Sequence, residues 1–252
     1  MYPAERQSEI VRLARSGDGS VAISDLTVRL DVAAETIRRD LAVLERQGLV
    51  LRRRGGATVR DAQPFELGIS TRNSLEAEQK RAISERVVEL LPPDGVVLMD
   101  SGSTTHALAG VFPNRGLTVV TNNLAAVPRL LERSQLAVHV LPGRVRHVTH
   151  GAVDLWAWQR LGKLHGDVAI IGANGVTARG ATTTIPEEAA LKAAMVAAAR
   201  FRILAVTSSK LGVESFCRYA GLDEFDVVVT DNGASPEIAD EIRAAGPDLI
   251  LA

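Results

Sequence analysis

The chain has 252 residues, of which 46% are hydrophobic and 23% charged, as is ordinary for a globular protein. This composition excludes disorder over most of the chain, and no apolar run reaches the ~18 residues that a membrane span needs. The single Cys217 excludes an internal disulfide, and no His or Cys pair has metal-ligand spacing. The charged N-terminus lacks the apolar core of a secretory signal. We therefore expect a cytoplasmic protein of two domains that has no metal, no cofactor and no membrane partner.

Charge is distributed unevenly along the chain. Residues 1–60 contain 11 Lys and Arg against 8 Asp and Glu, whereas the remaining residues contain 18 against 22. A basic segment of this kind favours an anionic partner for the N-terminal part. The excess of basic residues is small, so the case for an anionic partner depends on where these residues lie in the sequence.

Three short helices and a hairpin are expected in residues 1–60. Apolar side chains at helical spacing predict helices at Ile10–Ala14, at Ser24–Leu30 with Ser24 as N-cap, and at Glu35–Gln47. Residues 31–34 join the second helix to the third, and Gly48 is expected to end the third. Residues 49–59 alternate loosely around Gly55-Gly56, which predicts a turn between two short strands.

Two helices joined by so short a turn, the second rich in Arg, describe a helix-turn-helix. In the third helix Ile37 and Leu41 are expected to face the core. Thr36, Arg38 and Arg39 lie near the start of that helix, where such helices contact base edges or phosphates. The planar guanidinium of Arg suits both partners, because it can bind guanine or phosphate through two hydrogen bonds.

Arg52, Arg53 and Arg54 precede the Gly pair, so the hairpin is expected to contact the DNA backbone or a minor groove. The alternative is that the helical Arg residues form a solvated face and that the hairpin Arg residues only keep an edge strand soluble. The order of helix, tight turn, basic helix and basic hairpin favours DNA binding.

The rest of the chain predicts an α/β domain. Residues 61–73 are expected to be a linker, which gives domains at 1–60 and 74–252. Continuous apolar strands interleaved with helices predict a Rossmann-like parallel sheet covered on both faces. The expected strands are Val96–Met99, Leu117–Val120, Ala137–Leu141, Val168–Ile171, Ile203–Val206, Val227–Val229 and Leu249–Leu251, and the expected helices include Leu75–Leu91, Leu124–Arg133 and Glu187–Ala199.

Ligands of open parallel sheets bind beyond the carboxyl ends of the strands, and those ends are polar here. After the first strand, a Gly flanked by hydroxyl residues enters a helix, which offers backbone N–H groups to an anion. The Gly-Lys-Ser/Thr ending of a nucleotide-binding loop is absent, so a small phosphate ester is expected. The alternative is that the hydroxyls only cap the helix. The candidate effector contacts are Asp100, Gly102, Ser103, Thr104, Thr105, Asn122, Asn174, Glu187 and Lys210.

Glu187 and Glu188 also have a structural explanation. They follow Pro186 in the first turn of an alanine-rich helix, where carboxylates interact favourably with the helix dipole. One of them is nevertheless a candidate acceptor for sugar hydroxyls. Lys210 is expected to supply a positive charge to the phosphate from a second strand end.

The run VAAETIRRDLAVLERQGLVLRRRGGA resembles the signature of the DeoR family of bacterial transcriptional regulators. The resemblance continues in DSGSTT, VTNN, GANG, PEEA and SSK, over nearly the whole chain. It implies a winged helix-turn-helix followed by a sugar-phosphate-sensing domain similar in fold to ribose-phosphate isomerases. Ala33 or Ala34 stands where the family usually has a capping Ser, and Arg54 stands where a His is common. We expect neither departure to prevent DNA binding, although both can alter the preferred operator.

The likeness to isomerases makes an enzyme the main rival hypothesis. In those isomerases the loop that resembles GANGVT carries two acidic residues, whereas this chain has Asn174 and Thr177. Isomerisation needs a base near the substrate carbon, so no catalysis is expected. A third possibility is a constitutive DNA-binding protein whose sensor domain is only an oligomerisation scaffold.

We expect a repressor of a carbohydrate-utilisation operon. The resemblance implies that a phosphorylated sugar releases the protein from double-stranded operator DNA. A homo-oligomer, dimer or tetramer, is expected because one winged helix contacts too few base pairs for a specific operator.

Overall fold

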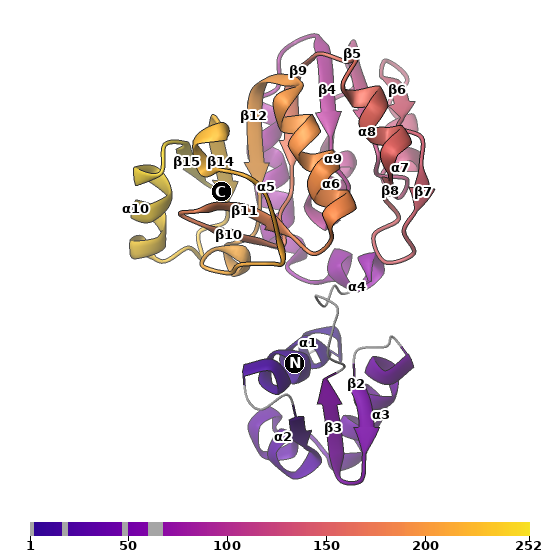
Figure 1. The fold of residues 1–252 in the computed structure, drawn as a ribbon, viewed down its shortest axis with the longest axis vertical. Helices are drawn as coiled ribbons and strands as arrows, with labels where there is room; N and C mark the ends of the chain where they lie inside the picture. Colours follow the sequence, from indigo (N-terminus) through magenta and orange to yellow (C-terminus); the bar gives the residue numbers. More distant parts are fainter. Residues whose placement is uncertain (1–2, 17–19, 47–49, 60–67) are drawn as a thin grey trace. The chain divides into compact units, whose positions relative to one another are not determined.

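The computed structural model describes residues 3–16, 20–46, 50–59 and 68–252 (Figure 1). The chain divides into two compact units, Met1–Leu67 and Gly68–Ala252. Between Gly68 and Ala252 no helix combines the length and the apolar character that a bilayer requires, and none does so in the described part of the first unit.

The first unit is a helix-turn-helix with a small antiparallel sheet. Its elements are α1 (Pro3–Ser16), β1 (Ser20–Ala22), α2 (Ile23–Leu30), α3 (Ala34–Arg46), β2 (Val50–Arg53) and β3 (Gly56–Val59), and the sheet order is β1-β3-β2. Ile37, Leu41 and Leu44 are fully buried on one side of α3. The helix-turn-helix and its basic hairpin are therefore confirmed. The expected endings of the first helix at Gly17–Gly19 and of the third at Gln47 and Gly48 lie outside the described residues.

Two details of this unit differ from the sequence prediction. Strand β1 was not expected, and it pairs Val21 with Ala57. Ser24 does not cap α2, because the helix begins at Ile23. The Ile23 N–H instead donates to the carbonyl of Gly55 at 2.8 Å. The hairpin turn thus satisfies the helix end that the Ser hydroxyl was expected to satisfy.

Part of the expected linker is helical. Helix α4 (Ile69–Ser74) overlaps residues 61–73 and ends one residue beyond them, and Ile69 is buried. The Ile69 N–H donates to the carbonyl of Val148 at 2.7 Å. A buried apolar residue and a hydrogen bond between distant parts of the chain fix this helix in the second unit, although its sequence is polar. Residues 61–67 lie outside the described residues.

The second unit contains a seven-stranded sheet in the order β15-β14-β12-β9-β4-β5-β6. Every neighbouring pair of strands is parallel, as expected. The strands are β4 (Gly95–Met99), β5 (Leu117–Thr121), β6 (Ala137–Val140), β9 (Gly166–Ile171), β12 (Ala199–Ala205), β14 (Val227–Thr230) and β15 (Asp248–Leu251). Strand order reverses between β4 and β9, which is the switch point where open sheets bind ligands.

Helices cover both faces of the sheet (Figure 1). One buried cluster joins the sheet to α5 (Ala77–Glu89), α6 (Ser103–Val111) and α7 (Val127–Leu131). The other joins it to α8 (Leu155–Leu161), α9 (Pro186–Ala197) and α10 (Pro236–Ala244). The unit is therefore the doubly covered α/β domain that the alternating strands and helices predict.

Two smaller sheets were not expected. One consists of β10 (Gly175–Thr177), β11 (Gly180–Thr183) and β13 (Cys217–Ala220), and the other of β7 (Arg144–Val145) and β8 (Ala152–Val153). Short turns η1 (Ser208–Lys210) and η2 (Leu222–Glu224) complete the unit. These strands have two to four residues and lack the long apolar run by which buried strands are recognised.

Candidate functional site

The exposed face of α3 carries the residues expected to read DNA. Thr36 is partly exposed, and the side chains of Arg38 and Arg39 are 54% and 81% exposed. Both guanidinium groups lie near Glu35, at 3.2 Å from Arg38 and 3.9 Å from Arg39. Exposed pairs of this kind contribute little to stability, so a phosphate or a guanine edge can replace Glu35 at low cost.

The hairpin presents a second basic surface. Arg52, Arg53 and Arg54 are all exposed at the end of β2. Two Gly residues allow the tight return: Gly55 has a φ of 84°, and a Cβ on Gly56 would lie 2.1 Å from the carbonyl oxygen of Val21. The hairpin therefore closes on β1 with its Arg side chains in solvent.

A buried acid on α3 was missed by the sequence prediction. Asp40 accepts hydrogen bonds from Arg6 Nε at 2.6 Å and Gln7 Nε2 at 2.8 Å, and all three residues are buried. These contacts tie α1 to the recognition helix. The signal was present, because Asp40 lies three residues after Ile37 and therefore shares the buried face of α3.

The switch point of the sheet is occupied by an ion pair. Asp100 follows β4, is buried, and pairs with Lys192 of α9. Asp100 also accepts a hydrogen bond from the Gly172 N–H at 3.2 Å, and the carbonyl of Gly172 accepts from Lys192 Nζ at 3.0 Å and from the Tyr219 hydroxyl at 2.9 Å. Burial raises the pKa of Tyr219 well above its usual value, so the phenol stays protonated. Asp100 is therefore neutralised within a closed network.

The hydroxyl-rich loop enters α6 without a side-chain cap. Ser103 and Thr104 begin the helix and are partly exposed, and no side chain caps its first turn. Thr105 is buried and donates to the carbonyl of Gly102 at 3.1 Å. The capping alternative is thus wrong for this helix. The first backbone N–H groups of a helix have no partner within it, so the loop offers donors to an anion.

Asn122 adjoins this loop from the end of β5. Its amide Nδ2 donates to the hydroxyl of Ser101 at 3.2 Å and to the carbonyl of Ala152 at 3.1 Å. Its Oδ1 is buried and accepts no hydrogen bond within the described residues. A buried acceptor without a donor is costly, and a ligand hydroxyl would satisfy it.

A second acidic group lies at the start of α9. Glu188 is buried and pairs with Arg146, and it accepts hydrogen bonds from Thr149 at 3.3 Å and Thr183 at 3.1 Å. The Thr183 hydroxyl also lies 2.9 Å from Oδ1 of Asn174. Asn174 and Glu188 therefore lie on either side of the same Thr183 hydroxyl.

Glu187, the residue selected from the sequence, is placed differently. It is exposed and lies 3.7 Å from Arg144. Glu188 therefore lies deeper than Glu187 and nearer to Asn174.

Lys80 and Lys210 lie close together near the carboxyl end of β12. Lys80 of α5 is buried, and its Nζ donates to the carbonyls of Arg72 at 2.6 Å and Leu75 at 2.5 Å. Burial lowers the pKa of Lys80 from 10.5 to about 8, and the nearby charges of Lys210 and Arg72 act in the same direction while Glu76 opposes them. The charges of Lys210 and Arg72 therefore lie close to Lys80.

The structure thus places the candidate residues in three groups at the carboxyl ends of the strands, which we call the carboxyl-end cluster. The loop from Ser101 into α6 lies beside Asn122, the Asn174 group includes Glu188, and Lys210 lies near Lys80. Sequence reasoning missed Lys80 and Lys192, because both lie within helices and no motif marks them. Among the described residues no three His, Cys, Asp or Glu side chains are placed to hold a metal ion.

Family models match both units. The model of the DeoR-like helix-turn-helix domain matches residues 6–63, and that of the DeoR C terminal sensor domain matches residues 75–232. The chain belongs to the DeoR family. This DeoR-family protein is a DNA-binding transcriptional regulator with a sensor domain, as the sequence motifs predicted.

Relatives of the DeoR-family regulator match it from end to end. It is 33% identical to the HTH-type transcriptional regulator GlpR of Haloferax volcanii, over 99% of this chain and 98% of the relative. It is 27% identical to the HTH-type transcriptional repressor GlcR of Bacillus subtilis, over 100% and 97%. It is 30% identical to the lactose phosphotransferase system repressor of Staphylococcus epidermidis, over 92% and 93%.

Solved structures are less similar. The sorbitol operon regulator SorC of Klebsiella pneumoniae matches 100% of this chain and 96% of its own, with a TM-score of 0.35 and 12% identity. A ribose 5-phosphate isomerase in complex with phospho-erythronic acid matches 53% of each chain, with a TM-score of 0.39 and 15% identity. Likenesses at these scores carry no argument about function.

Proposed function

We propose that this regulator is a cytoplasmic repressor of a carbohydrate-utilisation operon, which a phosphorylated sugar releases from double-stranded operator DNA. One observation carries the proposal: the uncapped start of α6 and the cations Lys80 and Lys210 lie at the same edge of one parallel sheet. Free N–H donors and cations favour a phosphate. Relatives named as GlcR and as the lactose phosphotransferase system repressor support the sugar and the repression.

The effector would bind across the carboxyl-end cluster. Its phosphate would lie on the backbone of Gly102 to Thr105, with Lys80 and Lys210 as charged donors. Its hydroxyls would bind Asn122, whose Oδ1 is buried and lacks a donor in the described residues, and Asn174 with Glu188. Asp100 would hold Lys192 in place rather than contact the sugar.

The same region of the sheet holds α4, which is the first helix of the second unit. The N–H of Ile69, at its start, donates to the carbonyl of Val148. Val148 belongs to a loop whose Arg146 and Thr149 both contact Glu188. The carbonyls near its end are bound by Lys80. An effector that competes for Glu188 and Lys80 would loosen both ends of α4. This gives a physical route from ligand binding to the DNA-binding unit.

The geometry favours this reading over an isomerase. Of the buried acids in the cluster, Asp100 is paired with Lys192 and Glu188 with Arg146. Asn174 and Thr177 cannot act as carboxylate bases. Proton abstraction needs a carboxylate that can reach the substrate carbon, and both of these carboxylates are held by a cation. We therefore propose that the regulator binds phosphosugars without turning them over.

Fluorescence anisotropy with operator DNA, over a panel of sugar phosphates, tests the proposal. We expect one phosphosugar to release the wild-type protein, while its unphosphorylated form does not. Lys210→Ala should need about 10- to 100-fold more effector for release, because a charge-assisted hydrogen bond contributes roughly 1.5–3 kcal/mol. Arg200→Ala, an exposed cation at the opposite end of β12, should behave as wild type.

Two results would contradict the proposal. Operator binding that no phosphosugar changes would make the sensor domain an oligomerisation scaffold. Interconversion of ribose 5-phosphate and ribulose 5-phosphate above the uncatalysed rate, lost in Glu188→Gln, would make the protein an enzyme.

A further inference from the structure

Exposed apolar side chains are concentrated at one edge of the sensor sheet. Eleven large hydrophobic residues are exposed in the described chain, and six of them lie between residues 131 and 158. These six, which we call the edge patch, are Leu131, Val140, Val145, Leu155, Trp156 and Trp158. Exposed apolar side chains that are grouped in one region of a surface are typical of interaction sites, whereas singly scattered ones are not.

The edge patch surrounds a strand with a free edge. Strand β6 ends the seven-stranded order and, within the described chain, pairs only with β5 (Figure 1). It reads Ala-Val-His-Val and has neither Lys, Pro nor an acidic residue. Proteins usually protect an exposed edge with such residues, because unpaired N–H and C=O groups invite another strand. The opposite edge, β15, begins with Asp248 and carries only Leu251 as an exposed apolar residue.

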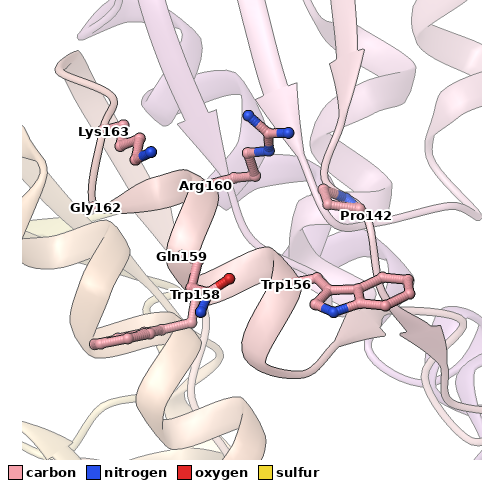
Figure 2. Close-up of a pocket in the computed structure, with 7 residues that line it drawn as sticks. All are labelled: Pro142, Trp156, Trp158, Gln159, Arg160, Gly162 and Lys163. Carbon is pink, nitrogen blue, oxygen red and sulfur yellow. The ribbon is translucent and has the colours of Figure 1, made fainter.

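Aromatic and cationic side chains of helix α8 line a groove beside this edge. An open groove of about 810 Å³ runs along it, lined by Pro142, Trp156, Arg160 and Lys163 among others (Figure 2). A second groove of about 430 Å³ continues beneath α8 onto His139 and the face of β5. Figure 2 shows the indole of Trp156 extending towards Pro142 and that of Trp158 extending away from it.

We propose that the edge patch is the surface through which a second copy of this chain binds, with β6 pairing antiparallel to the partner's β6. The inference deepens the proposed function, on which it rests for the expectation of an oligomeric repressor. A two-fold axis perpendicular to the sheet produces this arrangement and keeps both α8 helices on one face. Strand β6 carries no Lys, Arg, Asp or Glu, so no like charges would face each other across the axis.

The spacing on α8 fits a copy of itself. Trp156 and Arg160 are four residues apart and therefore lie on the same side of the helix. In an antiparallel pair about a two-fold axis, Trp156 meets Arg160 of the partner subunit and Arg160 meets the partner's Trp156. Arg over an indole is a favourable cation–π contact. Arg160 forms no ion pair within the described residues, so it is available for this contact.

Sedimentation velocity and intrinsic fluorescence over a dilution series test the interface. The two Trp residues of the chain both lie on α8, so its emission reports this surface alone. We expect the mass to rise from monomer to dimer with concentration and the emission to shift to shorter wavelength over the same range. A monomer at every concentration, or a dimer without the emission shift, overturns the proposal.

Three variants sharpen the test. Trp156→Arg should raise the dimer dissociation constant about 30-fold or more, because it sets Arg against Arg and removes a central aromatic anchor. Adding Arg160→Glu to Trp156→Arg should restore dimerisation through two Arg–Glu pairs. Phe216→Arg, which changes an apolar residue 72% exposed elsewhere, should dimerise as wild type. An unchanged far-UV spectrum in all variants shows that each is folded.

Other outcomes separate the interface from the proposed function. Wild-type mass in Trp156→Arg, or no recovery in the double variant, contradicts the interface. A monomer that binds operator and phosphosugar contradicts the interface and leaves the proposed function intact. A dimer that depends on α8, in a protein whose operator binding no phosphosugar changes, supports the interface and contradicts the proposed function.

Discussion

Individual side chains on α3 are expected to decide whether the regulator recognises its operator. Arg38 and Arg39 share one carboxylate, Glu35, and are otherwise exposed to solvent. This arrangement keeps two cations in place without burying them. A guanine edge or a phosphate would gain two charge-assisted hydrogen bonds from each Arg, which exceeds what an exposed ion pair contributes.

Arg38→Ala and Arg39→Ala should each weaken operator binding by about 1–3 kcal/mol. Anisotropy with operator and scrambled duplexes at matched salt measures the loss. If the residue reads a base, affinity falls for the operator alone, and if it binds a phosphate, affinity falls for both duplexes. Arg12→Ala is the control, because Arg12 is an exposed cation of α1 paired with Glu9. Wild-type operator affinity in both α3 variants would place the recognition surface elsewhere.

If Lys80 binds the effector as proposed, effector binding should depend on pH. Its pKa in the folded protein is about 8, below the 10.5 of an unburied lysine, chiefly because of burial. Between these values the unfolded chain holds the proton and the folded chain does not, so the free energy of unfolding rises with pH across this window. Below about pH 8 both states are protonated and the contribution is constant.

A phosphate is bound best by the protonated form of Lys80. We expect effector affinity to fall as pH rises through about 8, by up to about tenfold per pH unit. The phosphate itself stays doubly charged over this range, because its second pKa is about 6. Calorimetry in two buffers of different ionisation heat should detect proton uptake on binding near pH 8.5. Lys80→Gln should show no such uptake, and uptake that persists in this variant would assign it to another group.

At the scale of elements, the bond between α1 and α3 fixes the recognition helix. Asp40→Ala would leave Arg6 buried without its carboxylate, which costs about 3–5 kcal/mol. Asp40→Asn should cost less, because the side-chain oxygen still accepts from Gln7. Urea unfolding followed by far-UV circular dichroism should show the loss in the first unit. Tryptophan fluorescence should be unchanged, since both Trp residues lie in the second unit. Wild-type stability in the Asn variant would show that the ionic contact with Arg6 contributes nothing.

The elements that sequence predicts well are those with a long, regular pattern. The apolar runs at Val96–Met99 and Val227–Val229 marked strands of the central sheet, and the Ile37–Leu44 spacing marked the buried face of α3. Strands such as β11, with Gly and Thr in place of an apolar run, had no such signal. Helix α4 has only Ile69 as an apolar residue, and its bond to Val148 joins parts of the chain 79 residues apart.

The candidate site also has parts that a sequence pattern predicts and parts that it does not. Loops after strands could be recognised because parallel strands end at one edge, which located Asp100 and Asn122. The choice between Glu187 and Glu188 depended on the rotation of α9, which an alanine-rich helix does not reveal. Lys80 and Lys192 reach the cluster from helix interiors. Only the packing of α5 and α9 on the sheet shows that they belong there.

At the scale of the whole molecule, the regulator has to convert ligand binding in one unit into a change in DNA affinity in the other. Helix α4 is the first helix of the second unit. Val148 binds the N–H at its start, and Lys80 of the carboxyl-end cluster binds the carbonyls near its end. Coupling of this kind requires only that the effector binds more tightly when α4 is released.

Ile69→Pro should separate effector binding from release. Proline removes the N–H that donates to Val148, yet it is tolerated at the first position of a helix. Gly68 has a ψ of 147°, which suits a residue before proline. We expect effector affinity within a few-fold of wild type and a smaller change in operator affinity on adding effector. Ile69→Ala is the matched control, because it also empties the buried site and keeps the N–H. If both variants respond to effector as wild type does, the signal does not pass through this hydrogen bond.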